Sequence, residues 1–335
     1  MTTLSLPDLE ALISAALVAS NVSPANGASV ARALSAAEAD GQKGHGLSRV
    51  PSYAAQARSG KVDGHAKPDA KQSRPASIII DARHGFSYPA IDIAVDVLPA
   101  LARANGIAAA AVTRSHHFGV AAHPCERLAA GGLVALAFGN TPSAMSPWGG
   151  RRALFGTNPI AFAAPCSGRP AVVVDLALSE VARGRIMTAA LQKKTIPLGW
   201  ALDVSGQPTT NAEAALKGTL LPSGGAKGAA LALMVEVLAA ALTGSNFAFE
   251  ATSFFEADGA PPSVGQFLLA IDPGAFAGET SLPERISLLA QAIEHEAGAR
   301  VPGKRRFDLR DQAAAHGVDV DAALLADVQD IAHHG

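Results

Sequence analysis

The sequence predicts a mixed α/β (α+β) fold, and three observations lead to this class. Apolar residues recur at helical spacing near both ends of the chain. Between residues 76 and 281, short apolar runs bounded by glycine or proline alternate with amphipathic stretches, which is the pattern of strands joined by helices. No Gly-x-Gly-x-x-Gly motif follows a predicted strand, so the sequence favours a non-Rossmann fold.

Composition narrows the class of function. The 335 residues are 49% hydrophobic and 17% charged, a balance typical of a compact enzyme core. The formal net charge of −2 offers no electrostatic case for nucleic-acid or membrane partners. Cys125 and Cys166 provide neither a disulfide framework nor a cysteine metal site. The acidic amphipathic start is unlike a secretory leader, so we expect a cytoplasmic enzyme acting on a small molecule.

The amino-terminal region predicts two helices and a polar segment. Apolar residues recur at helical spacing over Pro7–Ala19, and Ser23 caps a second helix that runs to about Asp40. The glycine-spaced segment around His45 is polar. A basic connector, His65–Arg74, then marks the first domain boundary.

The remaining elements follow in order along the chain. Apolar runs between turn residues predict strands, and Ser179 is suited to cap a helix that begins near Glu180. The strands are predicted at Ile78–Asp81, Ile107–Thr113, Leu133–Phe138, Ile160–Ala164, Ala171–Asp175, Phe247–Phe255 and Gly265–Ile271. The helices are predicted at Ile91–Ala104, Ala121–Ala130, 180–192, Ala229–Leu242 and Leu282–Ala297, and, after a turn at Arg300–Arg306, from about Asp319.

His45 and Arg49 form the first candidate pair. His45 lies between two glycines, so its imidazole is accessible, and Arg49 follows one helical turn later. A histidine acid beside an arginine that grips a carboxylate suits the reduction of a 2-keto or 2-imino acid. The structural alternative is a surface loop that contains a histidine.

Two further patterns indicate anion sites. Gly224–Gly228, with Lys227, precedes a helix and could cradle an anion, although a plain turn explains it equally. Lys304–Arg306 could bind the extra phosphate of NADP, or it could be a solvated charged surface. His116 and His117 follow a strand, but adjacent residues point opposite ways and no carboxylate motif accompanies them, so we expect no metal site.

In combination these motifs resemble the type-2 malate/L-lactate dehydrogenase family over about residues 8–306. The histidine–phenylalanine loop and the Phe155–Pro165 run most resemble the reductases of Δ1-pyrroline-2-carboxylate and Δ1-piperideine-2-carboxylate. The motifs are Gly44-His45-Gly46 with Arg49, Ser115–Gly119, Phe155–Pro159, Asp175–Ala177, Pro197–Asp203, Gly224–Gly228 and Pro302–Arg306.

The resemblance implies a largely antiparallel sheet wrapped by helices, a helical domain of residues 1–75 and 282–335, and a catalytic domain of residues 76–281. It also implies a homodimer that reduces cyclic imino acids to L-proline or L-pipecolate with NADPH, with NADH as the alternative cofactor. His45 would donate the proton. The substrate residues implied are Arg49, Thr157, Arg183 and Gly184. The cofactor residues implied are His117, Phe118, Gly119, Val120, Ala121, Asp175, Leu176, Ala177, Lys227, Arg300, Pro302, Gly303, Lys304, Arg305 and Arg306.

Two positions depart from the family pattern. Gly44 stands where the family commonly has serine, and Arg185 stands where the imino-acid reductases are expected to have an acidic residue. A serine and an acid at these two positions would orient the imidazole of His45, and their absence leaves it without an obvious partner. Two alternatives therefore stay open. One is a 2-hydroxy-acid dehydrogenase of malate, lactate, ureidoglycolate or diketogulonate type, with His116 or His117 as the acid/base and NAD as cofactor. The other is a non-catalytic nucleotide-binding member.

Overall fold

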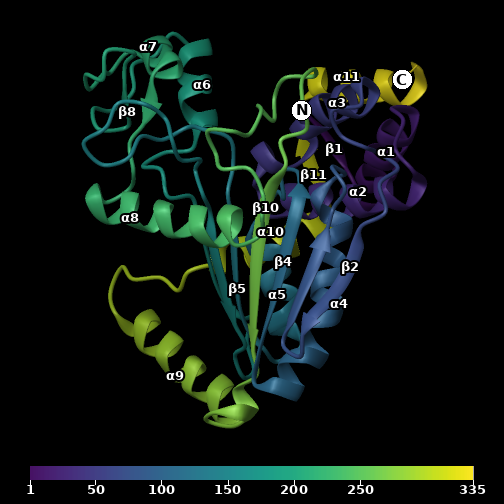
Figure 1. The fold of residues 1–335 in the computed structure, drawn as a ribbon, viewed down its shortest axis with the longest axis vertical. Helices are drawn as coiled ribbons and strands as arrows, with labels where there is room; N and C mark the ends of the chain where they lie inside the picture. The colour runs from purple at the N-terminus through teal and green to yellow at the C-terminus, as the bar shows by residue number, and fades with distance from the viewer. Residues whose placement is uncertain (335) are drawn as a thin grey trace.

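The computed structural model describes residues 1–334, and a seven-stranded mixed sheet forms its centre (Figure 1). The strand order is β2-β3-β4-β10-β5-β6-β7, in which only β3 and β4 are parallel. The predicted mixed α/β fold is confirmed. The strands are β2 (Asp69–Arg74), β3 (Ser77–Asp81), β4 (Ile107–Ser115), β5 (Val134–Gly139), β6 (Ile160–Ala164), β7 (Val172–Leu176) and β10 (Val264–Ile271).

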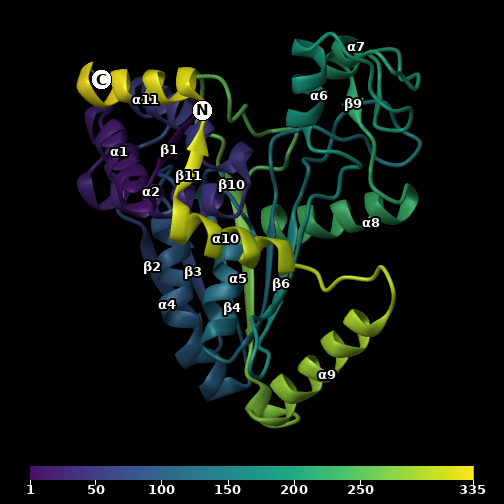
Figure 2. The same cartoon turned by 180° about the vertical axis from the view of Figure 1, so that it is seen from behind.

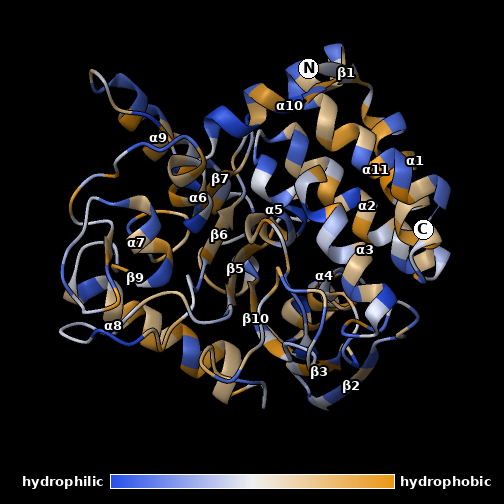
Figure 3. Ribbon diagram, turned by 90° about the horizontal axis from the view of Figure 1, so that it is seen from above, coloured by the Kyte–Doolittle hydropathy of each residue, from blue (hydrophilic) through white to orange (hydrophobic). Residues whose placement is uncertain are grey.

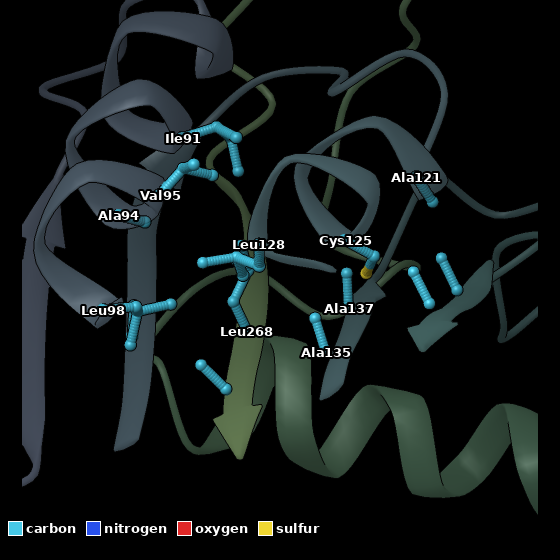
Figure 4. Close-up of a cluster of buried hydrophobic side chains, with 14 of the residues drawn as sticks. Ile91, Ala94, Val95, Leu98, Ala121, Cys125, Leu128, Ala135, Ala137 and Leu268 are labelled. Atoms are coloured by element: carbon cyan, nitrogen blue, oxygen red, sulfur yellow. The ribbon is translucent and has the colours of Figure 1, made fainter. Parts of the chain in front are cut away.

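Helices α4 (Ser87–Asn105) and α5 (Ala122–Ala130) cover one face of the sheet. Their apolar residues pack on small side chains of the strands, as Figure 4 shows around Leu98, Leu128 and Leu268. The other face carries Phe267 and Leu269, which pack against the π-helical segment η3 (Glu236–Ala241). Burial on both faces explains why these strands read as continuous apolar runs.

A second hydrophobic cluster joins the two ends of the chain. It combines α1 (Leu6–Ala19), α2 (Pro24–Ala39) and α3 (Val50–Ser59) with α11 (Ala322–His334). Strand β1 (Thr2–Leu4) pairs with β11 (Val318–Val320), so both termini lie together (Figure 2). This cluster supports the proposed helical domain, whose boundaries stay a proposal. Strand β2 lies in the large sheet.

A third cluster forms a lobe on the other side of the sheet. Its elements are α6 (Arg183–Leu191), β8 (Ala201–Leu202), α7 (Ala212–Lys217), β9 (Thr219–Leu220) and α8 (Ala226–Val235). Figure 3 shows α8 as largely hydrophobic and the edge strand β2 as hydrophilic. Helix α9 (Ser281–His295) stands at the opposite end of the sheet (Figure 1). No helix among residues 1–334 is both long and apolar enough to cross a membrane.

Most predicted elements are confirmed, but several expectations were wrong. Phe247–Phe255 is a loop, in which the carbonyls of Phe254 and Ser253 accept from Gln56 of α3 and from Lys61 instead of from a neighbouring strand. The Oγ of Ser179 donates to the carbonyl of Val181, and α6 begins at Arg183 without a side-chain cap.

Near the carboxyl end, the turn predicted at Arg300–Arg306 runs into an unpredicted helix, α10 (Lys304–His316). The final helix begins at Ala322 instead of about Asp319, because Val318–Val320 forms β11. The sequence of α10 is strongly polar, so it carries little apolar periodicity. Ion pairs of Arg306 and Arg310 hold it to the body of the protein.

The central position of β10 leads to a stability prediction. Leu268 is completely buried between α4, α5 and the sheet, so Leu268→Ala removes apolar contacts and leaves a cavity. We expect a loss of about 3 kcal/mol in the free energy of unfolding. Urea unfolding at one fixed protein concentration measures this. The control is Leu191→Ala, since Leu191 is 85% exposed. Equal effects of the two substitutions would contradict the assigned core.

Candidate functional site

The strand register gathers several candidate segments at one end of the sheet. Ser115, at the end of β4, pairs with Val264 at the start of β10. At the same end, Gly139 closes β5, and Leu176 of β7 pairs with Ile160 of β6. His116, His117 and Thr157 lie in the loops next to these residues, and Asp175 lies in β7 itself. Strands far apart in the sequence therefore deliver the candidate residues to one edge.

His45 is held by a second histidine. Its Nδ1 lies 3.2 Å from Nε2 of His117, and the two rings stack with their centroids 5.1 Å apart. On the other side of the His117 ring, Nδ1 lies 2.6 Å from the hydroxyl of Tyr53. That hydroxyl is 3.1 Å from the hydroxyl of Tyr88. His45 therefore has a partner in His117, within a chain of two histidines and two tyrosines.

The chain of hydrogen bonds can be ordered in two ways, because each neutral imidazole donates at one nitrogen and accepts at the other. If the Tyr53 hydroxyl donates to Nδ1 of His117, then Nε2–H of His117 donates to Nδ1 of His45, and the His45 proton lies on Nε2. If Tyr53 accepts from Nδ1–H of His117, then Nδ1–H of His45 donates to Nε2 of His117, and Nε2 of His45 is free to take a proton from a substrate. The second order is the one in which neutral His45 can act as a base. Tyr53 is thus a site residue that sequence reasoning missed, because it lies in the interior of α3.

His116 points to a different partner. Its Nε2 lies 2.8 Å from Oε1 of Gln56, and its Nδ1 is buried without a hydrogen-bond partner among residues 1–334. Of the two adjacent histidines, His117 is the one that contacts His45. This geometry favours His117 over His116 as the partner in acid–base chemistry.

Burial keeps the three imidazoles neutral. Desolvation, with the positive charge of Arg49 adding to it, lowers the pKa of His45 to about 4 and that of His116 to about 3. The same two causes hold the pKa of His117 well below its ordinary value. At neutral pH these rings are therefore uncharged, and an anion beside Arg49 would raise their pKa values.

Arg49 is poised to bind an anion. Its Nε donates to the carbonyl of Gly44 at 2.7 Å, and its guanidinium carbon lies 4.8 Å from the ring centre of Phe255. One terminal nitrogen, NH1, is buried without a partner among the described residues. A buried, unpaired N–H is costly, so a ligand carboxylate is its natural complement.

The turn that carries Thr157 is rigid. The amide of Thr157 donates to Oγ1 of Thr141 at 2.9 Å, and Asn158, at a φ of 41°, donates from Nδ2 to Glu236 at 2.8 Å. A side chain at Gly156 would overlap Thr141, so glycine is needed there. The sequence identified the turn, but not Glu236, which lies in the π-helical segment η3.

Arg183 and Gly184 open helix α6 on the same lobe. Arg183 donates to the carbonyl of Leu216 at 3.0 Å, and a Cβ added at Gly184 would meet open space. Arg185 is exposed, with its guanidinium carbon 5.9 Å from the ring of Trp200. A Cβ at Gly44 would also meet open space, so Gly44 leaves a free volume next to His45. Lys227 is exposed in the first turn of α8.

Three segments expected to bind the cofactor lie together. The amide of Ala122, just after the Phe118–Ala121 loop, donates to Asp175 at 3.3 Å, and Arg306 donates to the same carboxylate at 3.0 Å. The exposed residues of the Asp175 and Arg306 segments are Leu176, Ala177, Arg300, Pro302, Lys304 and Arg305. Gly303 has a φ of 87° and approaches Val173 so closely that only glycine fits.

Arg306 also belongs to a largely buried ion-pair network. It contacts Glu126 at 2.6 Å and Asp40 at 3.3 Å. Arg310 bonds the same two carboxylates, and His123 lies 2.9 Å from Asp40. The network joins α2, α5 and α10. It therefore sets how the helical cluster sits against the cofactor segments.

Neither a metal group nor the large cavity coincides with the acid–base residues. Residues 1–334 contain no group of three or more His, Cys, Asp or Glu residues placed to hold a metal ion. A cavity of about 930 Å³ lies between α2, α4, α5 and α10. Phe118 and Val120 of the expected cofactor loop line it, whereas His45, Arg49, His117 and Thr157 do not. Its arginines are already paired with carboxylates.

Comparisons with known proteins agree along almost the whole chain. A family model described as malate/L-lactate dehydrogenase matches residues 4–329. The (2R)-3-sulfolactate dehydrogenase (NADP(+)) of Chromohalobacter salexigens is 53% identical over 308 residues, which cover 92% of this chain and 91% of that protein. The Delta(1)-pyrroline-2-carboxylate/Delta(1)-piperideine-2-carboxylate reductase of Pseudomonas syringae pv. tomato is 39% identical over 333 residues, covering 99% and 97%.

The solved structures agree with the sequences. The crystal structure of delta1-piperideine-2-carboxylate reductase from Pseudomonas syringae matches with a TM-score of 0.93 at 38% identity, covering 99% of this chain and 100% of that chain. Each of these proteins is named as a dehydrogenase or a reductase.

The ion-pair network predicts a pH-dependent stability. Burial alone would raise the pKa of Asp40, but hydrogen bonds from His123 and Arg310 lower it below its ordinary 3.8. The stabilisation by Asp40 is therefore complete above pH 3.8 and is lost as the pH falls through the lower folded value. We expect Asp40→Asn to cost about 2–3 kcal/mol of unfolding free energy at pH 7, measured by urea denaturation, with the difference shrinking in acid.

The control for this measurement is Asp96→Asn. The Asp96 side chain is 74% exposed and lies 3.7 Å from Arg127, so its loss should change stability little. A difference between wild type and Asp40→Asn that stays constant down to low pH would contradict the charged state assigned to Asp40.

Proposed function

Because the chain belongs to the malate/L-lactate dehydrogenase family, as its sequence predicted, we propose that it interconverts a 2-keto acid and a 2-hydroxy acid that carries a second anion. The favoured pair is 3-sulfopyruvate and 3-sulfolactate. That the chain is an oxidoreductase with a nicotinamide cofactor follows from its family and from its named relatives. The proposal concerns the substrate, the preference for NADPH and the roles of the residues.

One observation carries the proposal. Two neutral histidines, His45 and His117, lie in hydrogen-bond contact beside Arg49, which has a buried, unpaired N–H. An arginine fork binds a carboxylate, and a neutral imidazole exchanges a proton with the neighbouring oxygen. This arrangement suits a 2-keto or 2-hydroxy acid, whose carboxylate and reacting carbon are adjacent.

We propose that the second anion binds at the amino-terminal end of α6, in the lobe that contains α6, α7 and α8. Arg183 and Arg185 lie in the first turn of α6, where the helix N–H groups also favour negative charge. Gly44 leaves open space beside His45. The 53% identity with a sulfolactate dehydrogenase supports a sulfonate as this second anion.

The chain's own residues then have separate tasks. Arg49 and Thr157 hold the carboxylate, so that the reacting carbon is fixed relative to the cofactor. When bound, NADPH supplies a hydride to that carbon. His45 takes up a proton at Nε2 when the substrate carboxylate offsets the charge of Arg49, and gives this proton to the substrate oxygen, which leaves His45 neutral. Nδ1–H of His45 donates to Nε2 of His117 throughout, and the hydroxyl of Tyr53 keeps His117 in the tautomer that this bond needs.

The residues fit an NADP cofactor. The Phe118–Ala121 loop, Asp175–Ala177 and the Arg300–Arg306 segment are joined through Asp175, and Lys304 and Arg305 stay exposed for a phosphate. Gly224 and Gly225 have φ values of 67° and 64° before the first turn of α8, which contains Lys227. We propose a non-Rossmann cofactor site made by these segments, with NADPH preferred to NADH.

Two further proposals concern the assembly and its location. The apolar faces of α8 and α9 expose Leu233 and Leu288, at 54% and 63%, which supports a homodimer. The unpaired cysteines Cys125 and Cys166 support a cytoplasmic location.

A second candidate is the reduction of Δ1-pyrroline-2-carboxylate to L-proline and of Δ1-piperideine-2-carboxylate to L-pipecolate. The match to such a reductase over 99% of this chain favours it. A cyclic imino acid also presents a carboxylate to Arg49 and a nitrogen to His45. It carries no second anion, however, and would gain nothing from Arg185.

A substrate panel tests the proposal. NADPH and NADH oxidation is followed with 3-sulfopyruvate, pyruvate, oxaloacetate and the two cyclic imino acids. We expect the highest kcat/KM with 3-sulfopyruvate and NADPH, and a loss of about tenfold for this substrate in Arg185→Gln, since a charged hydrogen bond is removed. His45→Ala should lower kcat far more than NADPH affinity.

The outcomes separate the candidates. Turnover of the cyclic imino acids alone would replace the proposal by the second candidate. Protection by NADPH in a thermal melt without any turnover would instead indicate a non-catalytic member. An Arg185→Gln variant that loses activity on pyruvate and 3-sulfopyruvate equally would contradict the second-anion site.

The neutral histidines predict the pH dependence of oxidation. His45 must accept a proton in this direction, so kcat/KM, which reports the free enzyme, should fall only as the pH drops through about 4. A bound carboxylate offsets the charge of Arg49 and raises the pKa of His45. The fall in kcat should therefore occur at a higher pH than the fall in kcat/KM. Steady-state kinetics from pH 4 to 9 measures both.

Tyr53→Phe provides a matched comparison in the same assay. It removes the hydroxyl that fixes the tautomer of His117 but keeps the buried ring. We expect a lower kcat, a shifted pH profile of kcat and little change in NADPH affinity. Circular dichroism at each pH checks that the enzyme stays folded. Coincident profiles of kcat and kcat/KM in the wild type would contradict the role given to Arg49.

A further inference from the structure

Lys61 is buried in an unusual way. It is 2% exposed, and its Nζ donates to three backbone carbonyls of one loop. The three are Ser253 at 2.8 Å, Glu256 at 2.9 Å and Asp258 at 3.1 Å. An ammonium group has three N–H donors, so each donor has one acceptor. Backbone carbonyls of the Ser253–Asp258 loop thus take all three donors of this buried lysine, and the carboxylates of Glu256 and Asp258 also favour its charge.

Two neighbouring side chains reinforce this attachment. Nε2 of Gln56 donates to the carbonyl of Phe254 at 2.7 Å, and Oγ of Ser59 donates to the carbonyl of Ala257 at 2.7 Å. Both belong to α3, the helix that also carries Tyr53. Five side-chain hydrogen bonds from residues 56–61 therefore fix a loop without regular secondary structure to the helix beneath it.

The loop places two aromatic rings against the site. The ring of Phe254 is buried, with its centre 5.1 Å from that of His116 and 5.3 Å from that of His117. The ring of Phe255 is 55% exposed and covers the guanidinium of Arg49. One tether thus controls the surroundings of both the acid–base pair and the anion receptor.

We propose that Lys61 is a positioning residue which holds Phe254 and Phe255 as a wall of the site, and that Phe255 determines how an anion reaches Arg49. This inference rests on the proposed function, because it assigns the substrate carboxylate to Arg49. The wall acts on substrate binding through the loop, whereas Lys61 itself touches no reacting atom.

The geometry at Arg49 explains the effect. The Phe255 ring occupies one face of the guanidinium, and the Gly44 carbonyl takes its Nε. The NH1 donor is buried and has no partner among the described residues. Because the ring covers one face, a carboxylate that pairs with NH1 is favoured in the plane of the guanidinium, in the geometry that orients a planar 2-keto acid. If the loop moves, other approach directions open and the orientation is lost.

Lys61→Met tests the inference, because methionine keeps the length and apolar body of the side chain but removes the three donors. We expect the KM of the best carboxylate substrate to rise about tenfold, with kcat changed less and NADPH affinity unchanged. Hydrogen exchange of residues 249–260 should become faster. The matched control is Lys67→Met, since Lys67 is exposed, and it should resemble the wild type in all four measurements.

Phe255 provides a second test that leaves the tether intact. Phe255→Ala should raise the KM by a similar factor and relax the preference among carboxylates of different size, while Phe255→Leu retains part of the selectivity. Hydrogen exchange in the loop should stay as in the wild type. This variant tests the wall even if Lys61→Met fails to fold.

The inference fails if Lys61→Met speeds loop exchange but leaves the KM unchanged, or if Phe255→Ala alters neither KM nor selectivity. If Lys61→Met lowers kcat, raises KM and weakens NADPH binding by equal factors, its role is purely structural. That result would also overturn the inference. Failure of the proposed function looks different, because the wild type itself would then show no turnover of the 2-keto acids.

Discussion

The insertion of β10 between β4 and β5 is the constraint on which the rest of the molecule depends. Residues 264–271 come late in the chain, yet they pair with strands that end near residues 115 and 139. Leu268 and Ala270 face α4 and α5, whereas Phe267 and Leu269 face η3. Burial on both faces fixes the register, since a slip by one residue would exchange the two sets of side chains.

This pairing also positions the chemistry. The Phe247–Pro262 loop precedes β10, and His116 and His117 directly follow β4. Because Val264 lies opposite Ser115, the aromatic loop arrives beside the two histidines. The same end of the sheet receives the Thr157 turn through the pairing of β5 with β6. Core packing and site geometry therefore have one origin.

The protein contains two kinds of buried charge, those that are paired and those that are not. In the network of Asp40, Glu126, Arg306 and Arg310, opposite charges are matched, and the network holds the helical cluster to α5 and α10. At the site, by contrast, Arg49 has no carboxylate and the neighbouring histidines stay neutral. An incoming anion completes this second set. Folding has thus already desolvated Arg49 and the histidines, so this cost does not fall on the binding of the anion.

Local sequence determined most of the elements and part of the site. Apolar periodicity, glycine turns and proline positions located most of the larger helices and strands, and the motif around His45 and Arg49 indicated acid–base chemistry on a carboxylate. Polar elements such as β2 and α10 were not predicted. Their stability comes from strand pairing and ion pairs, which leave no apolar pattern in the sequence. The apolar run at Phe247–Phe255 misled for the converse reason, since side chains of α3 and Lys61 take its carbonyl groups.

Only the tertiary structure decided which residues act together. The sequence placed His45 and His117 in separate segments with separate roles, and it left His45 without a partner in the absence of a serine before it. Folding brings the two rings into contact and places Tyr53 behind them. Such pairings join residues up to 72 positions apart, or about 190 in the case of Lys61 and its loop. They depend on strand order and helix packing, which no local pattern of residues records.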